Sequence, residues 1–458
     1  MGIKEPNTAS GNSAEHRNLP GLDPESKRAL IAAKARSQPK EKFVNLMHHL
    51  TFDLVKECLE KIPCKSAPGV DGMTAEAALR NLDWLLPPLL KAIHQGRYEA
   101  PPVRRVHIPK ANGGQRPIGV PEIIDRAIQA AMAKILGEIY EQDFLKCSFG
   151  FRPKLGCHHA LATIAELTHR SAMNYALEVD IRDFFGSLSH EWLRKFLGLR
   201  IGDNRVLKLI DAWLSAGVME NGKWQKMEKG TPQGGSISPL LSNIYLHYVL
   251  DLWFERKIKS RLCGKAHLVR YADDFVILFT RPEDVDVVKT LLTARLAQFG
   301  LEVSEEKTHK TELTPRENRG DGDRRSMTFL GFNIFRAITR NRTGWKTVFQ
   351  TEGGRLSRAK AAMKETLHRM MHWEVEKQAE RINALLVGHF SYYGIAGNTR
   401  KIAVFRHYTV RYWRRCLSSR SQNGAMNWEK MDEILRKSSL CPARIRISYP
   451  MLESYARL

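Results

Sequence analysis

The stretch RYADDFVILF (residues 270–279) places two adjacent carboxylates, Asp273 and Asp274, between two apolar runs. LVRY and FVILF have the composition of buried strands, and the residues between them are too few for anything but a tight turn. The sequence therefore predicts a β-hairpin with two carboxylates at its tip. Turn chemistry alone is one explanation, because Asp bonds nearby backbone and tolerates tight conformations. A bound cation is the other, because unpaired carboxylates beside buried strands are costly.

A third carboxylate, Asp180, favours a bound cation over turn chemistry alone as the explanation for the paired carboxylates. In NYALEVDIRDFF (residues 174–185) apolar residues alternate, with Leu177, Val179 and Ile181 on one face of a predicted strand and Asp180 on the other. Magnesium prefers oxygen ligands and commonly takes one or two carboxylates together with substrate phosphates. Two such ions about 4 Å apart can activate an attacking hydroxyl and stabilise a leaving oxygen in phosphoryl transfer.

The bulk composition points to a polyanionic partner. The 458 residues carry a formal charge of +23 with 43% hydrophobic content, which is enough for a large core in two or three packed units. Nucleic acid is the first candidate for that partner. A transmembrane protein is excluded by the lack of any apolar run near about 18 residues. Seven scattered cysteines without a CxxC pair favour a reducing cytosol.

Several segments can be placed from their patterns. Residues 1–42 are expected to form a flexible leader. Two strand-like runs in VRRVHIPKANGGQRPIGVP flank a hairpin turn near Asn112-Gly113, and residues 122–145 are expected to be helical. The charged, Gly-containing segment 337–354 is expected to be a loop at a domain boundary.

The chain from residue 355 onward is expected to be a basic helical region. It contains 20 Lys or Arg against 8 Asp or Glu, about half of the excess positive charge. Phe405, Tyr408, Tyr412 and Trp413 lie among its cations, a pattern suited to single-stranded or structured RNA. A solvated helix face with a few core aromatics is the alternative. The candidate nucleic-acid-binding residues are Arg400, Lys401, Arg406, Arg411, Arg414 and Arg415.

An ordered set of motifs resembles group II intron-encoded reverse transcriptases. YADD and DIRDFF resemble their catalytic boxes, and four further segments follow the family's order and spacing: IPKANGGQRPIGVPEIIDRAIQ (108–129), SFGFRP (148–153), GTPQGGSISPLLSNIYL (230–246) and FLGF (329–332). The resemblance runs from about residue 43 to about residue 422. Only CPARIRISYPMLESYARL follows residue 440, so the chain resembles the compact, class C-like members without an H-N-H endonuclease domain.

The resemblance implies an α+β right-hand polymerase followed by an α-helical thumb or maturase domain. Fingers and an antiparallel-sheet palm would span residues 43–340, the thumb or maturase domain 341–440, and a short tail 441–458. Asp180, Asp273 and Asp274 would be catalytic and would hold two Mg²⁺ ions, with Mn²⁺ as a substitute. Ile181 would add a backbone carbonyl ligand.

Other matched positions would bind the incoming nucleotide. Phe185 occupies a steric-gate position that favours deoxynucleotides, although a core aromatic is equally compatible with the sequence. Lys110 and Arg116 could instead be ordinary surface cations. Gln233 could belong to a simple turn, and Lys307 could be an ordinary surface lysine. The candidate nucleotide-binding residues are Lys110, Arg116, Phe185, Gln233 and Lys307.

The implied function is RNA-directed DNA polymerisation with intron RNA binding and splicing assistance in retrohoming. The partners would be intron RNA, an RNA template with a DNA primer, dNTPs and target DNA, in the bacterial cytoplasm and without a membrane. A non-enzymatic splicing cofactor is a second hypothesis, which the three retained aspartates disfavour. A domesticated relative acting in DNA repair or phage defence is the third.

Overall fold

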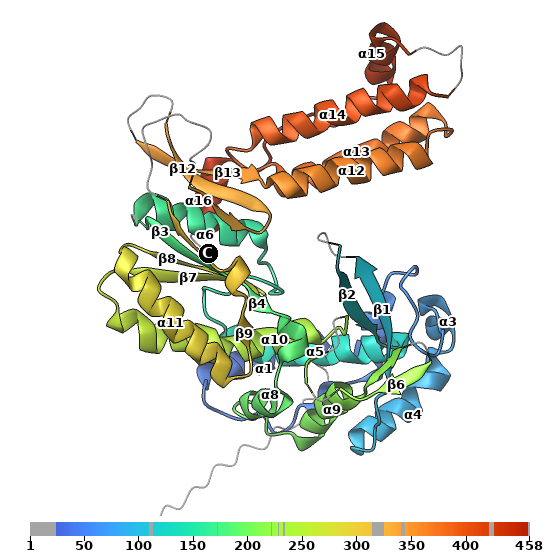
Figure 1. Cartoon of the computed structure of the whole chain (residues 1–458). Helices are drawn as coiled ribbons and strands as arrows, with labels where there is room; N and C mark the ends of the chain where they lie inside the picture. Colours follow the sequence, from blue (N-terminus) through green and yellow to red (C-terminus); the bar gives the residue numbers. More distant parts are fainter. Residues whose placement is uncertain are drawn as a thin grey trace, which may run out of the picture.

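The computed structural model describes residues 24–109, 113–171, 173–220, 222–227, 229–231, 234–313, 325–339, 344–420 and 426–456. Figure 1 shows a lower body of helices and two sheets, with a helical arm above it. Among the helices in these ranges, none has both the length and the apolar content needed to cross a membrane.

The central sheet carries the predicted hairpin. Its four strands lie in the order β10-β3-β8-β7, and all neighbouring pairs are antiparallel. The sequence prediction of an antiparallel palm with the carboxylates at a hairpin tip is confirmed. The strands are β3 (Tyr175–Val179), β7 (Ala266–Tyr271), β8 (Asp274–Phe279) and β10 (His309–Glu312).

Both faces of this palm sheet are buried, which explains the uninterrupted apolar run FVILF. Phe275 and Ile277 on β8 pack into one hydrophobic cluster, whereas the alternate residues Val276 and Leu278 pack into another. Side chains alternate across a strand, so burial on two sides requires apolar residues at every position.

Helices supply the two covers of the palm sheet (Figure 1). α6 lies on one side of the sheet, and α5 and α10 lie on the other. The short pair β4 (Ile181–Arg182) and β9 (Glu302–Val303) extends the palm beyond β3. The helices of this part are α6 (Cys157–Arg170), α7 (Phe184–Ser187), α8 (His190–Leu197), α9 (Asn204–Ser215), α10 (Ser238–Leu246) and α11 (Pro282–Gln298), with 3-10 turns at Lys259–Arg261 and Glu305–Lys307.

A second sheet and the N-terminal helices form the fingers. The strand order is β2-β1-β5-β6, in which β1 pairs antiparallel with β2 and parallel with β5. The predicted hairpin is present, and its turn residues 110–112 lie outside the described ranges. The elements are α2 (Phe52–Glu60), α3 (Ala75–Arg80), α4 (Leu82–His94), β1 (Val103–Pro109), β2 (Gln115–Val120), α5 (Ile123–Asp143), β5 (Val218–Glu220) and β6 (Lys223–Gln225), with a 3-10 turn at Met47–His49.

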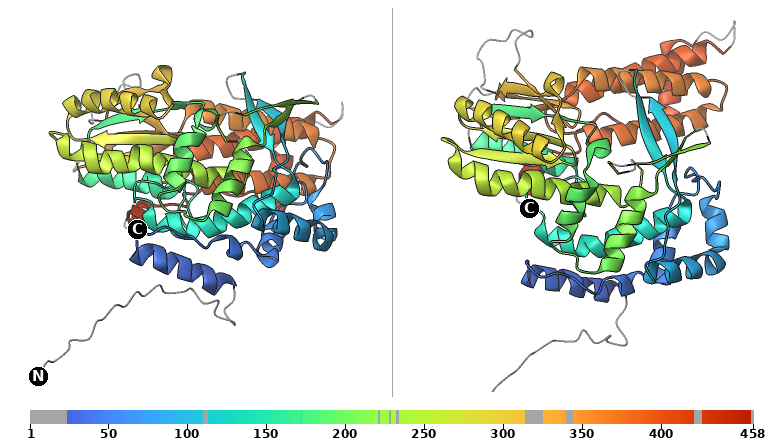
Figure 2. Two further views of the ribbon diagram at one scale, coloured as in Figure 1. Left: turned by 90° about the horizontal axis from the view of Figure 1, so that it is seen from below. Right: turned by 60° about the horizontal axis from the view of Figure 1, so that its bottom comes forward.

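The predicted leader is wrong over part of its length. Residues Pro24–Ser37 form helix α1, which lies along the lower edge of the molecule in both views of Figure 2. Its Ile31 and Ala35 are buried in the same cluster as α5. Charged residues of both signs are interspersed in this segment, so its sequence did not indicate that Ile31 and Ala35, one helical turn apart, are core residues. Residues 1–23 lie outside the described ranges.

The predicted boundary loop 337–354 is also wrong. A third sheet has the order β11-β12-β13, and β12 and β13 pair across residues 332–351. In β13 Thr347, Val348, Phe349 and Thr351 are buried. The charged residues and glycines suggested a loop, but packing against the second palm cluster stabilises a strand. The strands are β11 (Met327–Phe329), β12 (Phe332–Ile338) and β13 (Trp345–Thr351).

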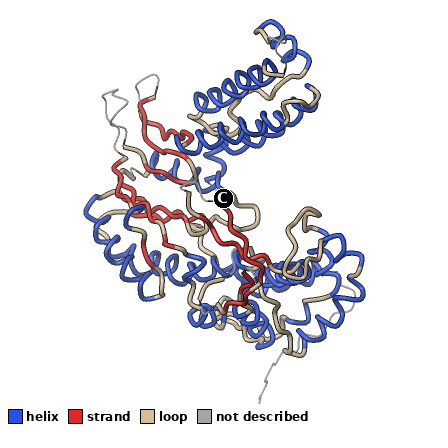
Figure 3. The backbone as a smooth tube through the Cα atoms, turned by 45° about the vertical axis from the view of Figure 1, so that its right-hand side comes forward, coloured by secondary structure: helices blue, strands red, loops and turns tan. Residues whose placement is uncertain are grey.

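The helical arm follows β13 and has its own core. Leu356, Ile382, Phe405 and Trp413 belong to a third hydrophobic cluster. In Figure 3 this arm consists of helices and loops, and the strands lie below it and to its left. The arm contains α12 (Gly353–Arg369), α13 (Val375–Tyr393), α14 (Thr399–Ser418) and α15 (Trp428–Lys437).

The expected tail is a helix that returns to the palm. α16 (Tyr449–Ala456) packs on α6, and its Leu452 is buried in the second palm cluster. The Tyr449 hydroxyl donates a hydrogen bond to the carbonyl of Thr347 on β13 at 3.0 Å. The Tyr455 ring stacks on His159 of α6 at 4.7 Å between centroids.

Candidate active site

The hairpin between β7 and β8 presents the paired carboxylates. Tyr271 pairs with Asp274, so Ala272 and Asp273 form the turn. Ala272 has a φ of 58°, in the left-handed region that residues with a Cβ rarely occupy. Asp273 is half-buried and Asp274 is solvent-exposed. This turn, residues 271–274, carries two of the three carboxylates that were predicted to be catalytic and is called the catalytic turn below for that reason.

A buried arginine holds the catalytic turn from beneath. The guanidinium of Arg270 is fully buried and donates two hydrogen bonds to the Asp251 carboxylate, at 2.8 and 2.6 Å. It also donates to the side-chain oxygen of Asn243 at 2.9 Å and to the carbonyl of Ala272 at 3.0 Å. A buried charge that is fully hydrogen-bonded in this way fixes a local geometry. Ala272 therefore has its strained backbone bonded directly to the palm core.

The helix that supplies Asp251 is irregular. After α10 the chain forms two π-helical turns, His247–Asp251 and Phe254–Ile258. Such turns are rare and occur often at functional sites. Here the first of these turns ends at Asp251, the carboxylate that pairs with Arg270 below the catalytic turn.

Strand pairing brings Asp180 beside the catalytic turn. Val179, the last residue of β3, is the cross-strand partner of Phe275. Asp180, which follows directly, therefore lies level with Asp274. The carbonyl of Asp180 accepts a hydrogen bond from the Ser304 amide at 2.8 Å. The Lys307 ammonium lies 2.9 Å from the Asp180 carboxylate. Three of the residues predicted for the site are thus gathered by β3, β8 and the 3-10 turn Glu305–Lys307.

The carboxylates affect one another's ionisation. Desolvation by the surrounding protein, followed by the charges of Asp273 and Asp180, raises the pKa of Asp274 to about 6. The positive charges of Arg355 and Lys307 oppose that rise in pKa. Desolvation also raises the pKa of Asp273, and the Arg116 guanidinium opposes the rise. A carboxylate raises the pKa of another carboxyl group only when the two lie close together, so these effects indicate that the three aspartates are near neighbours. A cation between these carboxylates would relieve their repulsion.

The donor set suits a hard divalent cation, because carboxylate oxygens are the preferred ligands of Mg²⁺. Within the described ranges no three His, Cys, Asp or Glu side chains are already arranged as a metal site. The Lys307 ammonium instead satisfies one oxygen of Asp180. Ile181, the predicted carbonyl ligand, is buried at the start of β4.

The fingers bring one of the predicted phosphate ligands to this site. Arg116 is exposed on β2, opposite Ile108, and its charge influences Asp273. Lys110 and Gln233, which were predicted to bind the nucleotide with it, lie outside the described ranges. The neighbouring Gly234 has a φ of 132°, and a Cβ there would be 2.5 Å from the Gly119 carbonyl oxygen. Gly234 is therefore packed tightly on β2.

Phe185 lies where the same segment meets α7. Its ring is half-buried and packs against the first palm cluster and the Phe184 ring, with 5.3 Å between ring centroids. Its carbonyl accepts a hydrogen bond from the Thr231 amide at 2.8 Å. A Cβ on Gly230 would be 2.7 Å from that carbonyl oxygen. Phe185 thus has both core contacts and an accessible edge beside the Gly-rich segment.

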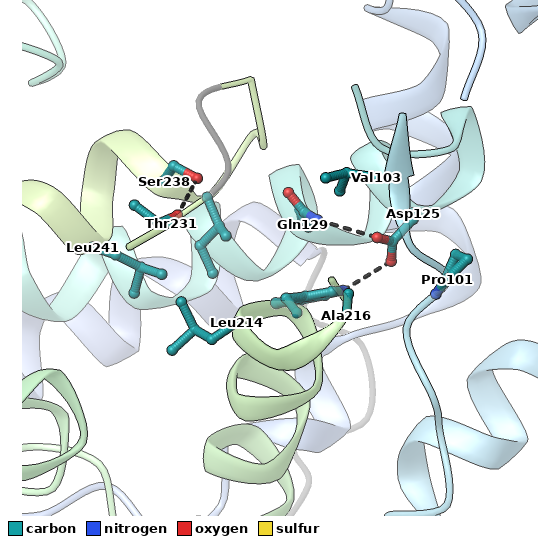
Figure 4. Close-up of a pocket in the computed structure, with 11 residues that line it drawn as sticks. Pro101, Val103, Asp125, Gln129, Leu214, Ala216, Thr231, Ser238 and Leu241 are labelled. Atoms are coloured by element: carbon teal, nitrogen blue, oxygen red, sulfur yellow. Dashed lines mark hydrogen bonds between the residues drawn. The ribbon is translucent and has the colours of Figure 1, made fainter. Parts of the chain in front are cut away.

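A buried carboxylate under this segment was missed in the sequence. Asp125 of α5 accepts hydrogen bonds from the Tyr98 hydroxyl at 2.7 Å and from the Trp213 indole at 2.8 Å. Burial raises its pKa. Figure 4 shows Asp125 and Gln129 in a small pocket that Thr231 and Ser238 also line. Asp125 ties α5 to α9 below the GTPQGG segment, so its role is structural.

The predicted nucleic-acid-binding residues of α14 divide into two groups. Arg400, Arg411 and Arg415 are exposed and Lys401 is half-buried. Arg406 donates to the carbonyl of Cys441 at 3.1 Å. Arg414 donates to the carbonyl of Met426 at 2.7 Å, and its guanidinium lies 4.6 Å from the centre of the Trp428 ring. The second group therefore fastens the following chain to α14.

The aromatic residues of α14 divide as well. Phe405 and Trp413 are core residues, and the Trp413 indole donates to Gln378 at 2.7 Å. Tyr408 and Tyr412 stack at 5.8 Å between centroids along the side that faces α12. Lys360 lies 5.4 Å from the first of these rings. Phe405 and Trp413 are therefore core aromatics, as the alternative interpretation of the sequence allowed, and Tyr408 and Tyr412 are the partly exposed rings of the predicted RNA surface.

Comparisons with known proteins find relatives of part of the chain. The family model "Reverse transcriptase (RNA-dependent DNA polymerase)" matches residues 108–334. Protein YkfC of Escherichia coli is 36% identical over 241 residues, which cover 46% of this chain and 63% of that protein. The group II intron-encoded protein LtrA of Lactococcus lactis subsp. cremoris is 40% identical over 181 residues, 38% of this chain and 30% of the relative.

A yeast intron protein is similar too. The COX1/OXI3 intron 1 protein of Saccharomyces cerevisiae is 30% identical over 321 residues, which cover 59% of this chain and 37% of the relative. The matched regions span less than two thirds of each of these three relatives.

Proposed function

We propose that the chain is an RNA-directed DNA polymerase, because residues 108–334 match the reverse transcriptase family model and parts of the chain are similar to a group II intron-encoded protein and to a yeast intron protein. The observation that carries the proposal is the convergence of Asp180, Asp273 and Asp274 at the open edge of the palm. Their mutual effect on ionisation supports a shared cation-binding role.

In this proposal the three aspartates hold two Mg²⁺ ions, with Mn²⁺ as a substitute. The ions would activate the primer hydroxyl and stabilise the oxygen that leaves with pyrophosphate. Arg270 and Asn243 position the turn that carries Asp273. Arg270 does so through its hydrogen bond to the Ala272 carbonyl.

The incoming dNTP would lie between the fingers and the palm. Arg116, together with Lys110, neutralises the triphosphate. Gln233 lies along the nucleotide, and Phe185 crowds a ribose 2′-hydroxyl. Lys307, which bonds Asp180 in this structure, supplies an ammonium group and a proton for the departing pyrophosphate.

Primer extension on an RNA template with Mg²⁺ and dNTPs tests the proposal. Asp273→Ala should reduce extension to background while template-primer binding persists, because the substitution removes a proposed metal ligand and none of the cations proposed to contact nucleic acid. Asp432→Asn is the matched control, since Asp432 is an exposed carboxylate on α15. Wild-type protein that extends no primer, or an Asp273→Ala variant that extends normally, would contradict the proposal.

A second function, binding of intron RNA and assistance in its splicing within retrohoming, is supported by the exposed cations of α14. Relatives named for their introns support it as well. Splicing assistance should survive Asp273→Ala, because RNA binding does not use the carboxylates. A role in DNA repair or phage defence is the alternative, and intron RNA sequence flanking the reading frame would disfavour it.

A further inference from the structure

The loop of residues 148–156 packs directly against the catalytic turn. The amide of Phe149 donates to the Arg270 carbonyl at 2.8 Å, and the Arg270 amide donates to the Cys147 carbonyl at 2.8 Å. The Asn243 side chain donates to the Gly150 carbonyl at 2.8 Å. A Cβ on Gly150 would be 2.3 Å from the Ala272 backbone nitrogen. Gly150 is therefore required for contact between the loop and the turn.

The residue after Gly150 has two features that folding does not explain. Phe151 has a φ of 59°, a strained conformation for an aromatic residue. Its side chain is 56% exposed, and it belongs to none of the three hydrophobic clusters of the described chain. A strained backbone that persists beside an active site is commonly part of its mechanism.

The loop is rigid at both sides of Phe151. Phe149 is buried in the second palm cluster. Arg152 pairs with Glu141 at 2.9 Å and donates to the carbonyls of Leu145 and Ser148 at 3.0 and 2.9 Å. Phe151 therefore lies next to Ala272 in a loop that is held in place on both sides.

A cation accompanies the exposed ring. Lys154 is exposed and has a φ of 62°, so it is a second left-handed residue in the same loop. An aromatic face and an ammonium group three residues apart can contact a base or sugar and a backbone phosphate respectively.

We propose that Phe151 and Lys154 hold the template–primer duplex beside the catalytic turn, with the Phe151 ring against its growing end. Phe151 is then a positioning residue that keeps the primer hydroxyl in register with Asp273 and Asp274. This inference rests on the proposed polymerase function and adds a contact site in the palm. The ring supplies an apolar contact surface for the duplex. Because the loop is packed on the catalytic turn, that contact fixes where the duplex lies relative to the carboxylates.

Two substitutions separate the ring from the backbone strain. Phe151→Ala removes the ring and keeps a Cβ at positive φ, whereas Phe151→Gly removes the ring and relieves the strain. Phe151→Tyr retains an aromatic face. Trp84→Ala is the matched control, because Trp84 is a 78% exposed aromatic residue on α4 of the fingers.

Two readouts are required: the Kd of a fluorescent RNA–DNA template-primer without dNTPs, and kcat and KM for extension. Both Phe151→Ala and Phe151→Gly should weaken duplex binding about fivefold to tenfold, because loss of aromatic stacking on nucleic acid has effects of that order. Phe151→Tyr should restore binding, and Lys154→Gln should reduce the salt dependence of Kd. Thermal stability of Phe151→Gly should equal or exceed that of wild type.

The outcomes separate this inference from the proposed function. If wild type fails to extend a primer, the polymerase proposal fails. If wild type extends but both ring deletions bind and extend normally, the polymerase proposal stands and the Phe151 contact is overturned. If only Phe151→Ala is impaired and Phe151→Gly behaves as wild type, the ring serves to hold the strained backbone and not to contact nucleic acid, which also overturns the contact.

Discussion

Five residues other than glycine have a positive φ in the described chain: Phe151, Lys154, Asp183, Ala272 and Leu330. Ala272 is in the catalytic turn, Phe151 and Lys154 are in the loop packed on it, and Asp183 follows Asp180 by three residues. Each such conformation costs about 1–3 kcal/mol. The strain is therefore concentrated around the carboxylates.

These residues mark the limit of prediction from sequence at the site. Asp180, Asp273 and Asp274 were predicted because each lies at the end of a strand-like apolar run and because YADD and DIRDFF resemble the family's catalytic boxes. Arg270 was quoted in the same stretch, but its burial was hidden, because arginine is usually exposed. Its partners Asp251 and Asn243 are on a distant helix, and no local periodicity relates them to the turn.

Glu122 offers a test of electrostatics away from the carboxylate site. Burial, then Asp71 and Asp125, raises its pKa to about 7. The folded protein therefore binds this proton more tightly than the unfolded chain does, so Glu122 lowers stability as the pH rises from about 4.5 to about 7. Glu122→Gln should stabilise the protein at pH 8 by about 1 kcal/mol after solvent screening.

Thermal unfolding at pH 5 and pH 8 measures the effect of Glu122→Gln. The difference from wild type should be small at pH 5 and clear at pH 8. Glu60→Gln, on the exposed side of α2, should shift neither midpoint. An equal gain at both pH values would contradict the electrostatic explanation.

At the scale of elements, strands buried on both faces were the easiest to predict. FVILF is apolar at each position, and β8 is enclosed by two hydrophobic clusters. β13 was missed because Trp345–Thr351 mixes Lys346 and Gln350 with its buried residues. Its stability comes from pairing with β12 and from α6 and α16, contacts that a local pattern does not contain.

The two groups of arginines on α14 should separate RNA binding from folding. Arg411 and Arg415 are exposed one helical turn apart, whereas Arg406 and Arg414 bond the chain after α14. Arg411→Gln with Arg415→Gln should weaken RNA binding and lower the slope of log K against log salt by about one to two, because phosphate contacts are lost.

The matched variant is Arg406→Gln with Arg414→Gln. It should lower the unfolding temperature and leave the salt slope near that of wild type. RNA binding by filter retention at several salt concentrations, with unfolding measured by circular dichroism, checks both expectations. A reduced slope in both double variants would show that all four arginines contact RNA.

At the scale of the whole molecule, α16 links the end of the described chain to the palm. Leu452 is 2% exposed between α6 and β13. Leu452→Ala should destabilise the protein by about 2–5 kcal/mol, because it opens a cavity in the second palm cluster. Met451→Ala is the control, since the neighbouring Met451 is 39% exposed.

Thermal unfolding and primer extension together test this link. Leu452→Ala should lower the unfolding midpoint and reduce extension near that midpoint, with normal extension at low temperature. Loss of extension at low temperature with an unchanged midpoint would mean that α16 acts on the site directly.

The position of α16 also has a consequence for how the protein is made. The ribosome synthesises α6, the palm strands and the whole helical arm before Tyr449–Ala456 emerges. Until then the face of α6 that receives Leu452 and Tyr455 has no cover. Domains usually fold in the order of synthesis, but this contact joins distant parts of the chain and forms late. A nascent chain would therefore complete the cover of α6 only once Tyr449–Ala456 has left the ribosome, after the palm strands and the helical arm have had time to fold.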